Sequence, residues 1–155
     1  SALARSLGRL FNRCYVDTDR LVERALGKTV AEVFSEDGED YFRDAETAQL
    51  ALLRMRKSLL VSCGGGSVAR EENWGLMHDM GVVVFLDGDL SDSLRQIRRP
   101  EKRPDLGTAA HAAELYRHRR PLYEKAADIT IDVRNRTFEQ VALDSGKLLW
   151  ERGLL

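Results

Sequence analysis

Three consecutive glycines, Gly64, Gly65 and Gly66, directly follow the apolar run at residues 59–63. The run is typical of a buried parallel strand, and open α/β sheets bind their ligands beyond the carboxyl ends of such strands. Because glycine has no Cβ, a small ligand can approach the main chain closely at this point. Glycine clusters also form plain turns, so the chemistry of this segment depends on the residues that surround it.

Two carboxylates follow another short apolar run in the same way. Asp17 and Asp19 come directly after residues 14–16. Such a pair can hold a magnesium ion through water and can accept a proton from a hydroxyl nucleophile. The alternative is that the pair caps the helix that carries Leu21, because aspartate is a favoured N-cap residue.

Basic residues supply the positive charge that a phosphate or carboxylate ligand requires. Arg43 can form a bidentate pair with a ligand carboxylate, although an isolated arginine on a helix is often a solvated surface residue. Two basic clusters flank an alanine-rich stretch, and the pattern suits a lid that closes over phosphates. The same clusters are also compatible with two solvated helix ends. The first contains Arg98, Arg99, Lys102 and Arg103, and the second contains Arg117, Arg119 and Arg120.

Strand and helix patterns alternate along the chain and predict a doubly wound α/β fold. Strands are expected at residues 14–17, 59–63, 82–86 and 129–131, with amphipathic helices between them, the longest from about 40 to 57. Thr29 with Glu32, and Thr137 with Gln140, match the capping box that begins a helix. Gly146 is a candidate break in the last helix.

Length and composition indicate one ordinary globular domain, residues 1–155. The chain has 43% hydrophobic residues, 32% charged residues and a formal net charge of -1. The charge does not indicate a nucleic-acid partner, and no apolar run approaches the roughly 18 residues needed to span a bilayer. Cys14 and Cys63 lack the spacing of a metal site or a disulfide framework. We expect a cytoplasmic protein without membrane or nucleic-acid partners.

Taken in order, these segments resemble the shikimate kinases over nearly the whole chain. The matching pieces are Val16-Asp17-Thr18-Asp19, residues 27–34, Gly38-Glu39 with Phe42-Arg43, the glycine triplet, Lys102-Arg103-Pro104 and residues 119–123. The resemblance implies a three-layer α/β/α fold of the P-loop, nucleoside-monophosphate-kinase-like class. It implies transfer of the ATP γ-phosphate to the 3-hydroxyl of shikimate, with Mg²⁺ as cofactor, in aromatic amino-acid biosynthesis. A monomer is expected by the same resemblance.

The resemblance also implies roles for individual residues at the acceptor. Asp19 is similar to the carboxylate that binds shikimate hydroxyls and helps to deprotonate the nucleophile. Arg43 and Arg119 are similar to the pair that binds the shikimate carboxylate. Gly64, Gly65 and Gly66 then contact the shikimate ring and its hydroxyls.

On the nucleotide side, the resemblance makes Asp17 and Ser1 the expected magnesium-side residues. Arg103, in a lid at about residues 103–118, is similar to the arginine that bridges ATP phosphates and acceptor. Arg136 is similar to the adenine-side arginine, with Arg134 as the rival. ATP is therefore expected to contact Ser1, Arg103 and Arg136.

The chain departs from the family in its phosphate loop, since Gly-x-x-x-x-Gly-Lys-Ser/Thr does not occur in the sequence. Gly27-Lys28-Thr29 does not replace it, because Val22 stands where the first glycine is needed. Ser1 aligns with the residue after the phosphate-binding lysine, so we expect a strand and loop upstream in the natural protein. Without them we expect feeble ATP binding and essentially no turnover.

Two other functions stay open from the sequence. The first is a shikimate-kinase-like protein that binds its ligand without catalysing transfer. The second is a related small-molecule kinase, such as a gluconate kinase, which the joint presence of Asp19, Arg43, Gly65 and Arg119 disfavours.

Overall fold

The computed structural model describes residues 2–88 and 109–155, and within them the four predicted strands are all present. They are β1 (Cys14–Asp17), β2 (Leu59–Ser62), β3 (Val84–Asp87) and β4 (Ile129–Asp132). β1 pairs with β2, and β3 pairs with β4, both in parallel. The registers place Asp17 opposite Ser62 and Asp87 opposite Asp132, so the carboxyl ends of each pair lie together.

The strands form two separate two-stranded sheets, where the sequence predicts one central sheet. In the described part of the chain no hydrogen-bonded ladder joins β2 to β3. β2 therefore has a ladder partner on one side, β1, among these residues. The side of β2 that faces away from β1 has no ladder partner among the described residues. The strand that carries the phosphate loop is expected to pair with β2 on that side.

The predicted helices that fall on described residues are present, with some different ends, and the helix expected around Leu94 and Ile97 lies outside the described residues. They are α1 (Ala2–Leu10), α2 (Thr18–Leu26), α3 (Val30–Glu36), α4 (Glu39–Leu53), η1 (Ser67–Ala69), α5 (Glu71–Met80), α7 (Ala109–Ala126) and α8 (Phe138–Glu151). Both predicted capping boxes form, at Thr29 and at Thr137. α4 ends four residues before the predicted Lys57. α8 continues through Gly146, so the predicted break is wrong there, because a buried glycine gives Phe11 room to pack.

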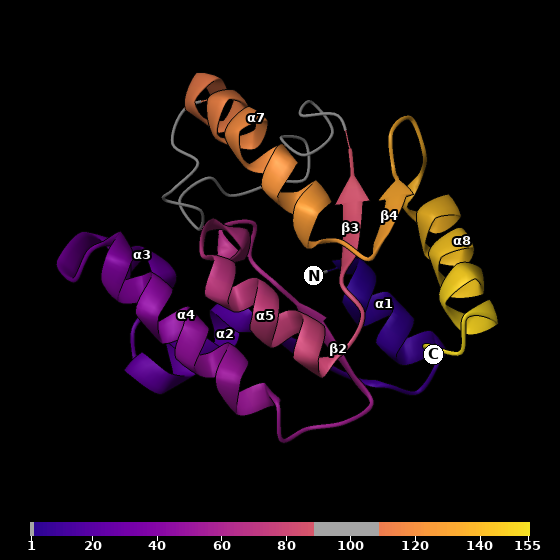
Figure 1. The fold of residues 1–155 in the computed structure, drawn as a ribbon, viewed down its shortest axis with the longest axis horizontal. Helices are drawn as coiled ribbons and strands as arrows, with labels where there is room; N and C mark the ends of the chain where they lie inside the picture. The colour runs from indigo at the N-terminus through magenta and orange to yellow at the C-terminus, as the bar shows by residue number, and fades with distance from the viewer. Residues whose placement is uncertain (1, 89–108) are drawn as a thin grey trace.

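The predicted lid falls partly on a regular helix. Residues 109–118 form the first half of α7, and residues 103–108 lie outside the described part of the chain. α7 contacts η1, the short helix that follows the glycine triplet. Figure 1 shows α7 beside the carboxyl end of β3 and above α5.

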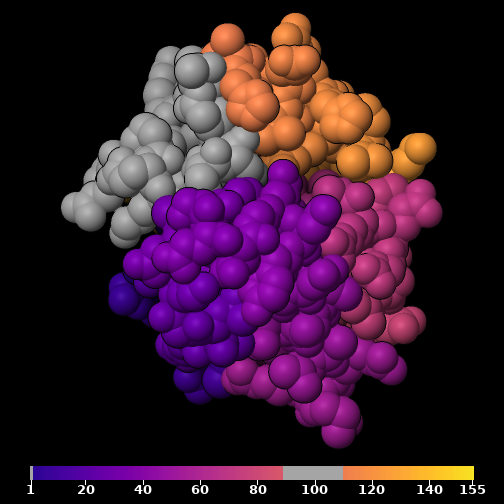
Figure 2. All heavy atoms as spheres, turned by 90° about the vertical axis from the view of Figure 1, so that its left-hand side faces the viewer, coloured from indigo at the N-terminus to yellow at the C-terminus, as the bar shows by residue number. Residues whose placement is uncertain are grey.

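Two apolar clusters pack the helices, the first against a strand and the second against one another. The first joins α1, β4 and α8 through Leu7, Ile129, Ile131 and Leu149. The second joins α2, α3 and α4 through Val22, Val33 and Phe42. Figure 2 shows α2, α3 and α4 forming one continuous face of the molecule. The first cluster therefore packs α1 and α8 on β4, and the second packs three helices on one another.

Crossing a bilayer takes a longer and more apolar helix than any found in residues 2–88 and 109–155.

Two helical glycines differ sharply in the space around them. A Cβ at Gly8 in α1 would lie 2.9 Å from the Arg13 carbonyl oxygen, whereas a Cβ at Gly75 in α5 meets no described atom within 4 Å. We expect Gly8→Ala to lower the free energy of unfolding by about 1–3 kcal/mol through overpacking. Gly75→Ala raises it by about 0.5–1 kcal/mol, because alanine favours the helix. Urea titrations of both variants measure the difference, and a G8A protein as stable as the wild type would contradict this packing.

Candidate acceptor site

Charged side chains lie beside every glycine of the triplet, and Gly64 also has Glu46 Oε2 at 3.5 Å from the place of a Cβ. A Cβ at Gly64 would lie 3.0 Å from Asp19 Oδ1, and one at Gly65 would lie 3.9 Å from Arg119 Nη1. A Cβ at Gly66 would overlap the Arg43 guanidinium. The structure therefore gathers around the triplet the acceptor residues that the sequence predicts. The structure also explains why residues 64 and 66 are glycines, because a side chain at either position would displace a charged group.

Arg43 projects from α4 into the protein, and the surface alternative is wrong. The residue is 5% exposed. Its guanidinium contacts Glu46 Oε1 at 3.2 Å and Glu39 Oε1 at 3.4 Å, and it lies 5.2 Å from the centre of the Phe42 ring. The ring and the carboxylates fix the guanidinium plane at Gly66 before a ligand arrives.

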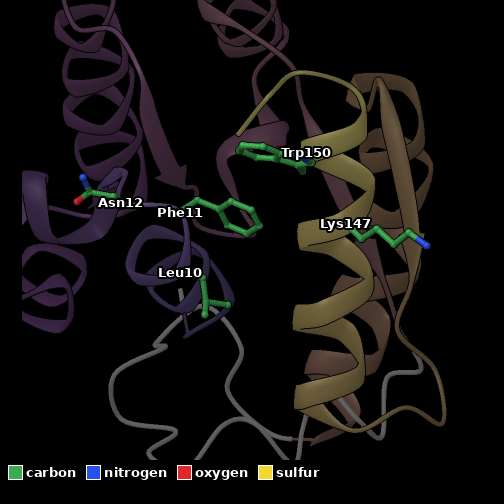
Figure 3. A pocket seen from close by; sticks show the side chains of 5 residues that line it. All are labelled: Leu10, Phe11, Asn12, Lys147 and Trp150. Carbon is green, nitrogen blue, oxygen red and sulfur yellow. The ribbon is translucent and has the colours of Figure 1, made fainter.

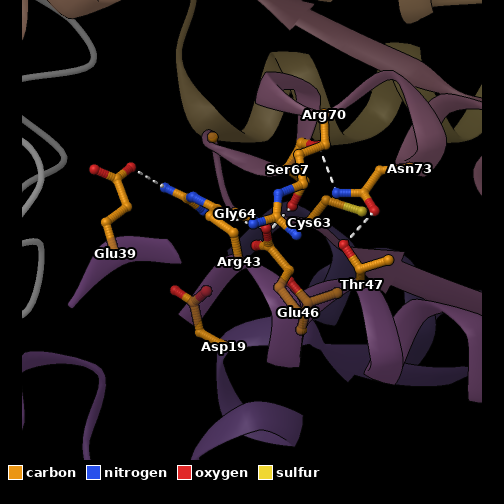
Figure 4. Close-up of polar contacts among 12 residues, drawn as sticks. Asp19, Glu39, Arg43, Glu46, Thr47, Cys63, Gly64, Ser67, Arg70 and Asn73 are labelled. Carbon is orange, nitrogen blue, oxygen red and sulfur yellow. Dashed lines mark hydrogen bonds and ion pairs between the residues drawn. The ribbon is translucent and has the colours of Figure 1, made fainter. Parts of the chain in front are cut away.

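A buried network of polar side chains continues from Arg43 behind the triplet (Figure 4). Glu46 is fully buried, and its Oε2 accepts a hydrogen bond of 2.9 Å from the Ser67 hydroxyl. The Asn73 amide donates to the Ser67 carbonyl at 2.9 Å and accepts from the Thr47 hydroxyl at 2.8 Å. α4 and α5 thus hold the segment that follows the glycines.

Reasoning from the sequence missed Glu46, Ser67 and Asn73. Glu46 carried a local signal, because residues three apart on a helix are neighbours and Glu46 follows Arg43 at that spacing. Ser67 and Asn73 carried none, since their partners come from other elements. A buried arginine and a buried glutamate need such partners to compensate their desolvation.

The residues at the end of β1 cap α2 and form a hydrogen bond to the segment that follows β2. Asp17 Oδ1 accepts from the Asp19 main-chain N–H at 3.0 Å and caps α2, so the capping alternative is right for Asp17. The fully buried Thr18 accepts from the Gly64 main-chain N–H at 3.2 Å. Asp19 is thereby left facing Gly64 rather than capping the helix.

Carboxylates make this end of the sheet electrically negative. Burial among protein atoms raises the pKa of the Cys63 thiol to about 12, and the charges of Glu46, Asp17 and Asp19 raise it further, although Cys63 keeps a solvent-accessible surface. The thiol therefore stays protonated at neutral pH and is a poor nucleophile. At the triplet itself, the guanidinium groups of Arg43 and Arg119 offset this negative charge.

α7 directs its two neighbouring arginines to different partners. Arg119 is 6% exposed and approaches Gly65. Arg120 forms a fork on Asp87 at the end of β3, with Nη2 to Oδ2 at 2.8 Å and Nε to Oδ1 at 3.3 Å. The Tyr116 hydroxyl also reaches Asp87, at 3.3 Å, and donates to the Gly88 carbonyl at 2.5 Å. The hydrogen bonds from Arg120 lower the pKa of Asp87 below its usual value.

Arg136 and its rival Arg134, two of the predicted nucleotide-side residues, both contact Asp132 at the end of β4. Arg136 contacts the Asp132 carbonyl at 3.0 Å and pairs with Asp144 of α8. Arg134 forms a fork on the Asp132 carboxylate, the closest atoms 2.7 Å apart. Ser1 and Arg103 lie outside the described residues.

A separate hollow lies between the end of α1 and α8 (Figure 3). Phe11 and Trp150 stack there with ring centres 5.8 Å apart, and Leu10, Asn12 and Lys147 complete the lining. It adjoins the amino end of β1, whereas the triplet follows the carboxyl end of β2. With one charged side chain and a largely apolar wall, it offers no chemistry for catalysis.

Ser67 and Ser145 are equally buried but differ in their hydrogen bonds, so substitution of Ser145 is a control for substitution of Ser67. We expect Ser67→Ala to lower the free energy of unfolding by about 1–3 kcal/mol, because the buried Glu46 carboxylate loses a donor. Ser145 is equally buried, but its hydroxyl has no hydrogen-bond partner among the described residues. Ser145→Ala should therefore change stability by less than about 0.5 kcal/mol or increase it. Chemical denaturation distinguishes the two, and equal losses would refute the role of Ser67.

The Arg120–Asp87 pair makes stability depend on pH in the acid range. Because the folded-state pKa of Asp87 is lowered, its ionised form stabilises the fold above the unfolded pKa of about 3.9, and this contribution disappears as pH falls through the folded pKa. Arg120→Gln should lower stability at pH 7 and reduce the further loss below about pH 4. Unfolding free energies measured at pH 7 and pH 3 test this. Lys147→Gln is the control, since its exposed pair with Glu151 spans 3.9 Å, and an R120Q protein that keeps the wild-type acid dependence would contradict the assignment.

Comparison with known proteins gives one family. The family model for shikimate kinase matches residues 1–149. Shikimate kinase 1 of Sodalis glossinidius is 38% identical over 146 residues, which are 92% of this chain and 82% of that protein. The shikimate kinase of Prochlorococcus marinus is 34% identical over 140 residues, which are 88% of this chain and 70% of that protein.

Solved structures agree with the sequence comparison. Shikimate kinase from Acinetobacter baumannii in complex with shikimate superposes with a TM-score of 0.90 at 29% identity, covering 99% of this chain and 88% of that chain. Shikimate kinase from Aquifex aeolicus gives a TM-score of 0.78 at 28% identity, covering 98% of this chain and 89% of that chain. The fold and the sequence point to the same conclusion, and the chain belongs to the shikimate kinase family.

Proposed function

We propose that this protein catalyses the ATP-dependent phosphorylation of the 3-hydroxyl of shikimate to give shikimate 3-phosphate, a step in aromatic amino-acid biosynthesis. The observation that carries the proposal is the arrangement at the glycine triplet. Asp19, Arg119 and Arg43 each approach a different glycine of one short segment. The solved complex of a related shikimate kinase with shikimate supports the choice of acceptor.

The acceptor has one carboxylate and several hydroxyls, and the site offers groups of matching chemistry. Arg43 and Arg119 are both buried cations, which bind a carboxylate more strongly than exposed ones do. Asp19 orients the attacking hydroxyl and accepts its proton as the oxygen bonds to the γ-phosphorus, while the bond from that phosphorus to the bridging oxygen breaks and ADP leaves. The glycine main chain contacts the ring between these groups and keeps water away from one face.

The nucleotide side of the proposal rests on the family resemblance. Mg²⁺, when bound with ATP, neutralises charge that develops on the phosphates. No group of three or more metal-ligating side chains occurs in the described residues, and magnesium at such sites needs only one or two carboxylates besides phosphate and water. Asp17 fits this requirement at the end of β1, and Ser1, Arg103 in the lid at 103–118 and Arg136 complete the assignment.

The proposal includes a monomeric protein that works in the cytoplasm as a single domain. Gel filtration of the purified chain measures its oligomeric state. In the full-length natural protein, a measurement of shikimate binding without turnover would favour the non-catalytic alternative instead.

Asp19→Asn tests the proposed base. In the full-length natural protein, we expect shikimate-dependent release of ADP to fall by about 10²- to 10⁴-fold in kcat, because an amide cannot accept the proton. Shikimate affinity, measured by calorimetry, should change much less than kcat. Asp79→Asn is the matched control, since Asp79 lies exposed on α5. Wild-type kcat in the D19N protein would refute the base, and a preference for gluconate in a substrate panel would refute the acceptor.

A further inference from the structure

Tyr123 lies at the candidate acceptor site, where its hydroxyl contacts the middle glycine of the triplet. We propose that its hydroxyl is a positioning group, which holds the middle of the glycine triplet in the conformation that binds the acceptor. The inference rests on the proposed function, because it names a determinant of acceptor affinity. Tyr123 acts through the main chain of Gly65 and is therefore a positioning residue rather than a catalytic one.

The contact is short and tightly packed. The Tyr123 hydroxyl donates a hydrogen bond of 2.8 Å to the Gly65 carbonyl oxygen. A Cβ at Gly65 would lie 3.0 Å from the same hydroxyl, so glycine is needed for α7 to approach this closely. Tyr123 follows Arg119 by four residues on α7, and residues at that spacing share a helix face. One face of α7 thus presents both the cation beside Gly65 and the group that holds Gly65.

The aromatic ring is itself held in place. Its centre lies 5.1 Å from that of Phe85 in β3 and 6.5 Å from that of Tyr116. Phe85 is 9% exposed and belongs to the core. The hydroxyl is therefore presented by a ring with little freedom to turn, which lowers the entropy lost in making the bond.

The hydrogen bond from Tyr123 to Gly65 fixes the orientation of more than one main-chain group. All described peptide bonds are trans, so fixing the Gly65 carbonyl toward α7 also directs the Gly66 N–H the opposite way. Gly66 is the residue that the Arg43 guanidinium covers. Tyr123 therefore sets the main chain between the two arginines proposed to bind the carboxylate.

The flanks of the triplet have other attachments. The Gly64 N–H bonds to Thr18, and the Ser67 carbonyl accepts from Asn73. These bonds hold the two ends, and the Ser67 N–H donates to the Gly64 carbonyl at 3.0 Å, which closes a turn across Gly65 and Gly66. The Gly65 carbonyl is the group of this turn that Tyr123 holds, and glycines allow the peptide to rotate more freely than other residues do. Loss of the Tyr123 hydroxyl should leave the turn in place and free the Gly65 carbonyl.

Tyr123→Phe removes the hydroxyl and keeps the ring. We expect the dissociation constant for shikimate, measured by calorimetry on the whole chain, to rise about 3- to 10-fold, as for the loss of one hydrogen bond. The melting temperature and the KM for ATP should stay close to wild-type values, because ring packing is retained. A general loss of structure would move all three quantities.

Tyr116→Phe is the matched control on the same helix. It removes a hydroxyl that bonds to Asp87 and Gly88, away from the triplet. Shikimate affinity in this variant should stay within about twofold of the wild-type value. Such a change is smaller than the one that the loss of a hydrogen bond causes.

Three results would overturn the inference. Unchanged shikimate affinity in Y123F would refute it while leaving the proposed function intact. Equal weakening in Y123F and Y116F would show an effect of the whole helix and would also refute the specific role. Wild-type protein that does not bind shikimate would refute both the positioning role and the proposed function.

Discussion

The contact between three glycines and charged side chains constrains everything around the site. Asp19, Arg119 and Arg43 come from α2, α7 and α4, and each lies beside a different glycine of the segment after β2. These three helices must therefore end or pass beside the carboxyl end of one strand. The packing of α2 and α4 on each other, and of α7 on η1, follows from that requirement.

The position of Arg43 depends on a buried ion pair, which by itself is weak evidence for stability. Removing two charges from water is unfavourable, and the attraction between Arg43 and Glu46 offsets it only with further hydrogen bonds. Ser67 supplies one of them, and Asn73 fixes Ser67 in turn. We interpret the network as stabilising one arrangement of the triplet over others, so that the site is formed before a ligand binds.

α7 joins the two strand pairs, which no ladder connects among the described residues. Arg119 and Tyr123 contact the segment after β2, while Arg120 and Tyr116 contact the end of β3. Residues that contact one strand end alternate along α7 with residues that contact the other. A displacement of α7 would therefore alter the contacts at both strand ends together. The acceptor segment after β2 and the end of β3 therefore depend on a common element.

The sequence by itself determined the strands, the capping boxes at Thr29 and Thr137 and the glycine segment, because these depend on neighbouring residues and on local periodicity. The order of the motifs, through the family resemblance, also predicted that Asp19, Arg43 and Arg119 lie together. Only the tertiary structure decided that Arg43 is buried, that Glu46 and Asn73 support it, and that Arg119 and Arg120 face different strands. The spacing of Arg43 and Glu46 on one helix was a local signal for their pairing. Burial, and the contacts of Asn73, Arg119 and Arg120, are set by elements distant in sequence, so no local pattern could reveal them.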